Sequence, residues 1–72
     1  MRLTRMRYPV VFERTQTGYS AYAPDLPGLG VAGDSFEETK RLMAEAIVFH
    51  IEGMRDAGES IPEPSRIELV EV

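Results

Sequence analysis

The sequence predicts an α+β domain in which a three-stranded antiparallel sheet is packed by one long helix and followed by a C-terminal strand, in the order β-β-β-α-β. Three observations support this prediction. The first part of the chain alternates with a period of two, residues 36–57 repeat apolar positions about every 3.6 residues, and residues 66–72 alternate again. With 72 residues and no internal repeat or linker, the chain is expected to be one domain, 1–72.

The first two expected strands form a hairpin. Apolar side chains alternate along residues 6–13, at Met6, Tyr8, Val10 and Phe12. This period is typical of a half-buried strand, and Pro9, which cannot donate a backbone hydrogen bond, favours an edge position. The polar connection of residues 15–18 ends in glycine, as a hairpin turn should, and Tyr19–Ala23 then alternates again until Pro24 ends the second strand.

The stretch from Pro24 to Glu38 joins the strands to the helix. Its prolines fix φ and its glycines permit positive φ, so the chain should turn, pair again over residues 29–32 and enter the helix at Ser35. Ser35 and Glu38 have the S-x-x-E spacing of a capping box. The residues expected to fix the structure of this stretch are Pro24, Asp25, Pro27, Gly28, Gly33, Ser35 and Glu38.

The helix should continue to Gly58, a natural residue just after a helix end, for a length of about 22 residues. One stripe of it is apolar or weakly polar and should lie on the sheet: Phe36, Met43, Ile47, His50, Ile51 and Met54. Leu42 and Phe49 lie one heptad apart on a flank of this stripe. They either widen the core contact or form an interface with a second subunit, and the broad stripes common in globular helices favour the core.

After the helix, the chain should return to the sheet. Ile61-Pro62-Glu63-Pro64-Ser65 cannot continue a helix and is expected to run extended. In residues 66–72, Ile67 and Leu69 alternate with Glu68 and Val70, which predicts the last strand.

Composition limits the function classes. Hydrophobic residues make up 43% of the chain and charged residues 28%, as in soluble globular proteins. The net charge of −4 argues against a phosphate-backbone binder and is compatible with a basic protein partner. The basic opening, residues 1–5, is not followed by an apolar run of signal-peptide or membrane-span length, so a cytoplasmic location without membrane contact is expected.

The small size of the chain predicts association with another chain. A domain of this length buries only about 60% of its unfolded surface. It has no cysteine for a disulfide and no His/Cys cluster for a structural metal. A homo-oligomer, dimer or tetramer, or a partner protein is therefore expected.

Residues that could carry chemistry each have a simpler structural explanation. His50 could act as a base, but no Ser or Cys nucleophile is indicated near it, which favours packing or an interface hydrogen bond. Asp25, Asp34, Glu37 and Glu38 could hold Mg²⁺, yet turn formation, helix capping and the helix dipole explain them as well. The glycines lack phosphate-loop spacing, and core or interface packing explains the tyrosines Tyr8, Tyr19 and Tyr22 better than base stacking. No catalytic residue, metal ligand set or cofactor is predicted.

Several motifs together resemble the HicB-like antitoxin family. These are Pro24-Asp25-Leu26-Pro27-Gly28, then Gly33-Asp34-Ser35 with Glu38, and finally Gly58 followed by Ile61-Pro62-Glu63-Pro64-Ser65. Tyr8-Pro9 and Gly18-Tyr19 match the family as well. The likeness extends from about Arg7 to Ser65, and the joint occurrence of P-D-L-P-G and G-x-x-I-P-x-P-S makes it fairly specific.

The resemblance implies a partial RNase H-like fold and a protein-binding role without catalysis. Such domains bind HicA, a small basic mRNA-cleaving toxin with a double-stranded-RNA-binding-like fold, and they also associate with themselves. Full-length family antitoxins usually carry a DNA-binding domain after the fourth strand. Because this chain stops at Val72, no appended DNA-binding domain and no direct DNA binding are expected.

Three hypotheses follow. The first is an antitoxin that neutralises a HicA-like toxin. The second is an orphan oligomeric scaffold or small-ligand binder without a toxin. The third, which the sequence disfavours, is a metal-dependent RNase H-like nuclease using Asp25 and Asp34.

Overall fold

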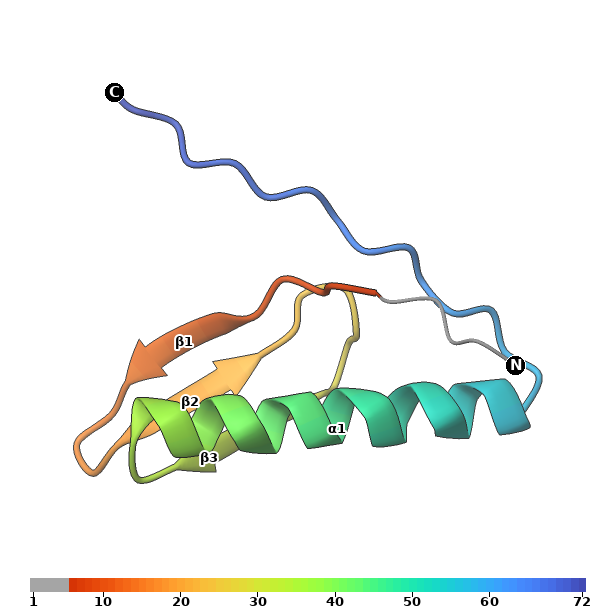
Figure 1. Ribbon diagram of the computed structural model, residues 1–72, viewed down its shortest axis with the longest axis horizontal. Coiled ribbons are helices and arrows are strands. Elements are labelled where there is room, and N and C mark those ends of the chain that lie inside the picture. The colour runs from red at the N-terminus through yellow and green to blue at the C-terminus, as the bar shows by residue number, and fades with distance from the viewer. Residues whose placement is uncertain (1–5) are drawn as a thin grey trace.

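The computed structural model describes residues 6–72 and has the predicted α+β architecture. Strands β1 (Val11–Arg14), β2 (Tyr19–Tyr22) and β3 (Gly30–Gly33) form an antiparallel sheet in the order β1-β2-β3. The helix α1 (Phe36–Asp56) packs against β2 and β3 (Figure 1). The basic opening, residues 1–5, lies outside the described residues.

Strand β1 begins later than the alternation over residues 6–13 predicts. The register gives the reason: Val11 pairs with Tyr22, which is the last residue of β2, so residues 6–10 have no described strand opposite them. Pro9 also lacks the N–H that a ladder would need. The alternation still orients side chains toward the core. Tyr8 and Val10, which precede β1, both pack against that core.

The core lies between the sheet and the helix and is small. Its fully buried apolar side chains come from β2, the loop after it and the helix: Ala21, Ala23, Leu26 and Met43. Ala21 on β2 and Ala23 just after it let the helix approach the sheet closely, and Met43 packs in the same core. At the end of this layer the ring of Phe36 lies 4.6 Å from that of Phe12 and 5.9 Å from that of Tyr19, measured between centroids.

Local signals at both ends of α1 account for its bounds. At its start Ser35 is the N-cap, with extended backbone angles. At its end Ala57 is the C-cap, and Gly58 follows with a φ of 75°, a conformation that glycine adopts without steric cost. The amide of Glu59 donates to the Met54 carbonyl, which completes the terminal turn. The predicted helix is confirmed.

The predicted strand at residues 66–72 is not formed: in the described chain no residue after the helix belongs to a strand. The segment first passes Tyr8, whose hydroxyl donates to the Pro62 carbonyl. It then leaves the body, and Figure 1 shows it extending away from the sheet. An extended segment becomes a strand only when another strand pairs with it, and none of β1, β2 and β3, the strands of the described residues, does so.

Candidate interaction surfaces

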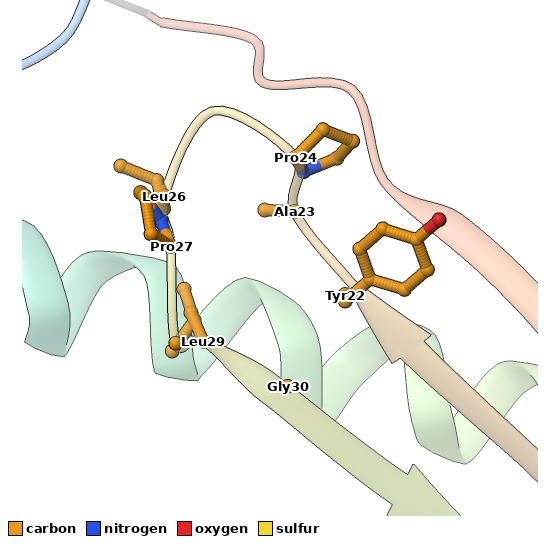
Figure 2. A pocket seen from close by; sticks show the side chains of 8 residues that line it. Tyr22, Ala23, Pro24, Leu26, Pro27, Leu29 and Gly30 are labelled. Atoms are coloured by element: carbon orange, nitrogen blue, oxygen red, sulfur yellow. The ribbon is translucent and has the colours of Figure 1, made fainter.

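The loop between β2 and β3 is a pair of tight turns built around one buried anchor. Leu26 is 1% exposed; its amide donates to the Ala23 carbonyl, and its own carbonyl accepts from the Leu29 amide. Gly28 has a φ of 84°, which explains glycine at this position. Around the loop lies a shallow hollow of about 450 Å³, lined by residues that Figure 2 labels: Tyr22, Pro24, Leu26, Pro27, Leu29 and Gly30.

Asp25 in this loop binds Ser65, which is 40 residues further along the chain. One carboxylate oxygen accepts from the Ser65 amide at 2.6 Å and the other accepts from the Ser65 hydroxyl at 2.6 Å. These bonds stabilise the charged carboxylate and lower the pKa of Asp25 below its ordinary value. We call this pair of hydrogen bonds the Asp25–Ser65 clasp.

A second bond beside the clasp fixes the same segment. The Tyr8 hydroxyl donates to the Pro62 carbonyl at 2.5 Å. Burial raises the pKa of Tyr8, and the negative charges of Glu63 and Asp25 raise it further. The family-like motifs P-D-L-P-G and I-P-x-P-S are therefore in contact, and Tyr8-Pro9 lies next to them.

The motif at the helix start is a capping arrangement. The Ser35 hydroxyl accepts from the Glu38 amide at 3.1 Å, and the Glu38 carboxylate accepts from the Asp34 amide at 2.9 Å. The fully buried Thr39 hydroxyl donates to the Ser35 carbonyl. A Cβ on Gly33 would lie 2.7 Å from the Thr39 hydroxyl oxygen, so this close approach requires glycine.

The outer face of α1 carries an exposed apolar strip, which we call the Phe49 strip: Ala44, Val48 and Phe49. The side chain of Phe49 is 80% exposed and that of Val48 is 56% exposed. The core role favoured by the sequence is therefore wrong for Phe49, whereas Leu42 is half-buried. Glu45 and Glu52 flank the strip along a shallow hollow of about 380 Å³. The strip thus has an apolar centre and carboxylates at its rim.

The candidate chemical residues are dispersed. Both oxygens of Asp25 accept from Ser65, while Asp34 contributes its backbone amide to the helix cap. His50 is half-buried on the helix, in a hollow with Phe49, Gly53, Met54 and Glu59. In residues 6–72 no three His, Cys, Asp or Glu side chains are grouped so that they could hold a metal ion.

Sequence reasoning missed the partners of Asp25 and Tyr8. It assigned Asp25 to a local turn, whereas the structure brings it to Ser65. The only signal for this contact was the joint occurrence of the two motifs, because no local pattern links residues so far apart. As for membranes, none of the described helical residues forms a helix long and apolar enough to cross one.

Comparison with known proteins agrees with the motif geometry. Residues 8–71 match the family described as HicB_like antitoxin of bacterial toxin-antitoxin system. An uncharacterized 14.9 kDa protein from the rep-hol intergenic region of Haemophilus phage HP1 is 43% identical over 63 residues, covering 88% of this chain and 47% of the phage protein. "Antitoxin HicB 2" of Photorhabdus laumondii is 37% identical over 60 residues, covering 83% of this chain and 43% of that protein.

The chain spans less than half the length of these two curated relatives. The family match nevertheless includes the β2–β3 loop, the helix start and both partners of the clasp. The chain therefore belongs to the HicB-like antitoxin family of bacterial toxin–antitoxin systems.

Proposed function

We propose that this chain is a protein-binding module that neutralises a HicA-type, mRNA-cleaving toxin by binding it, without catalysis of its own. Membership in the antitoxin family supports the role, as does a curated relative that is named as an antitoxin. The net charge of −4 suits a basic partner. Inhibiting a toxin that cleaves mRNA implies that the protein works in the cytoplasm. The strand order and the position of the helix are compatible with the partial RNase H-like fold of the family.

The observation that supports a docking surface most directly is the exposure of Phe49 at 80%. Large aromatic side chains at the centre of an apolar patch often contribute most of the binding energy of a protein interface. Glu45 and Glu52 at the rim would attract a basic partner and orient it. The Phe49 strip is therefore the proposed contact for the toxin.

The test is inhibition of a purified HicA-type ribonuclease by the 72-residue chain. Wild type should block RNA cleavage and form a complex, and Phe49→Ala should weaken binding about tenfold or more, since it truncates the central anchor. Glu52→Gln should slow association in a salt-dependent way. Its matched control is Glu37→Gln, which removes the same charge from the first turn of the helix, away from the strip.

Two results would contradict the proposal. Failure to bind or inhibit any HicA-type ribonuclease would remove the toxin-binding function and favour the orphan scaffold. Full inhibition by Phe49→Ala would leave the function intact but place the toxin elsewhere on the domain. We also propose that the chain associates with itself, because its buried apolar core is small.

A further inference from the structure

The segment from Arg66 to Val72 has the pattern of a strand but no partner. Its aliphatic side chains are among the most exposed of the chain, with Ile67 at 63%, Leu69 at 98%, Val70 at 78% and Val72 at 118% of their reference areas. β-branched and aliphatic residues in this density are typical of strands and unfavourable in water. Such a segment is expected to be covered in the working protein.

Two contacts fix where this segment leaves the domain. The Asp25–Ser65 clasp holds the residue just before it, and the Tyr8–Pro62 bond holds the chain three residues earlier. From this point the segment runs outward, and Figure 1 shows it diverging from its own sheet. The same contacts that anchor the segment therefore direct it away from its own sheet.

A complementary edge exists on the same domain. Strand β1 is at the edge of the sheet, with β2 on one side and no strand from residues 6–72 on the other. An open edge offers unpaired N–H and C=O groups to an added strand. The charges also fit once the residues ahead of β1 are included: residues 66–72 carry one basic and two acidic side chains, whereas residues 7–14 carry two arginines and one glutamate, and β1 alone is neutral. The two segments are thus of opposite net charge.

We propose that residues 66–72 of one chain pair with the β1 edge of a second copy. Residues 66–72 of the second copy pair with β1 of the first in the same way. This reciprocal exchange closes a two-fold dimer and adds a fourth strand to each sheet. It covers Ile67 and Leu69, which share one face of the added strand, and the β1 edge of both copies, and so adds burial that the small core lacks. The inference rests on the self-association proposed above and adds the segment and the edge that form it.

The first test is the mass of the 72-residue chain in solution, by sedimentation equilibrium. Wild type should be a dimer, and the double variant Ile67→Asp with Leu69→Asp should be a folded monomer with unchanged helical circular dichroism. The matched control is Gln16→Asp with Thr17→Asp, which places the same two charges on the exposed turn between β1 and β2 and should leave the dimer intact. A monomeric wild type, or a dimer that persists in the first variant, would overturn the proposal.

The second test identifies the edge. In a mixed sample of isotope-labelled and unlabelled chains, NMR should detect contacts between residues 66–72 of one chain and β1 of the other. Contacts to β1 only within one chain, or only between two C-terminal segments, would refute the exchange. Toxin inhibition by the Ile67→Asp, Leu69→Asp variant separates the two proposals: inhibition without dimerisation shows that toxin binding does not depend on the exchange.

Discussion

The carboxylate of Asp25 accepts two hydrogen bonds from Ser65, one from its amide and one from its hydroxyl, each 2.6 Å long. The two residues belong to motifs that lie before and after the helix, 40 residues apart in sequence. Their contact fixes the chain that follows the helix against the loop between β2 and β3. The clasp thus explains why an aspartate stands between Pro24 and Leu26, which the turn alone does not require.

Removing the clasp should release residues 61–65 without unfolding the sheet. Asp25→Ala eliminates both hydrogen bonds, so the Ser65 amide should exchange with solvent at nearly the rate of an unprotected amide, while core amides keep their protection. Hydrogen exchange followed by NMR measures both. Ser60→Ala, at an exposed serine nearby, is the control and should leave exchange unchanged. Continued protection of Ser65 in Asp25→Ala would show that the clasp does not form in solution.

Acid should open the clasp. Folding lowers the pKa of Asp25 from its ordinary value of 3.8, so the clasp contributes its full stability above that pH and loses it as pH falls through the lowered pKa. The chemical shift of the Ser65 amide should therefore titrate below pH 3.8, in step with Asp25. Asp25→Asn, which cannot ionise, should abolish this titration. A Ser65 shift that follows a transition above the ordinary value would contradict the assignment.

The capping box should stabilise the domain by a measurable amount. Ser35→Ala removes the acceptor of the Glu38 amide and should lower the free energy of unfolding by about 1 kcal/mol in urea denaturation. Ser35→Asp, which retains a capping oxygen, should stay close to wild type. If Ser35→Ala and Ser35→Asp were equally stable, the cap would not contribute to stability.

Replacing two of the glycines by alanine should change the free energy of unfolding in opposite directions. Gly53 lies within α1 with open space around it, so Gly53→Ala should raise the free energy of unfolding by about 0.5–1 kcal/mol. At Gly18 a Cβ would lie 2.1 Å from the Gly33 carbonyl oxygen, so Gly18→Ala should lower stability by more than about 1 kcal/mol. Thermal or urea unfolding of both variants measures the two changes in stability. A stable Gly18→Ala protein would mean that the β1–β2 turn can shift away from β3.

The helix could be predicted from the sequence because its determinants are local. A capping serine, an apolar stripe and Gly58 all lie within or next to the element that they define. The first residue of β1 could not be predicted from the sequence, because the first pair of the ladder, Val11 with Tyr22, depends on where β2 ends. The strand at residues 66–72 was expected from alternation, but alternation identifies a segment that can pair and not the strand with which it pairs.

The candidate surfaces were predictable only in part. The heptad spacing placed Leu42 and Phe49 on a flank of the apolar stripe, and the sequence favoured a core position for both. Exposure of Phe49 at 80% depends on how far the sheet extends beneath the helix, and four-residue strands cover only part of a helix of 21 residues. Leu42 is half-buried, and its assignment as an interface residue stays a prediction.

The long span of the clasp affects how the protein folds during synthesis. The hairpin and the helix use neighbouring residues, so they can form while the ribosome is still adding the rest of the chain. Ser65 reaches Asp25 across 40 residues and Pro62 reaches Tyr8 across 54, so these contacts wait until the residues after the helix have emerged. A nascent chain therefore passes through a stage with its sheet and helix in place and residues 61–65 still unanchored.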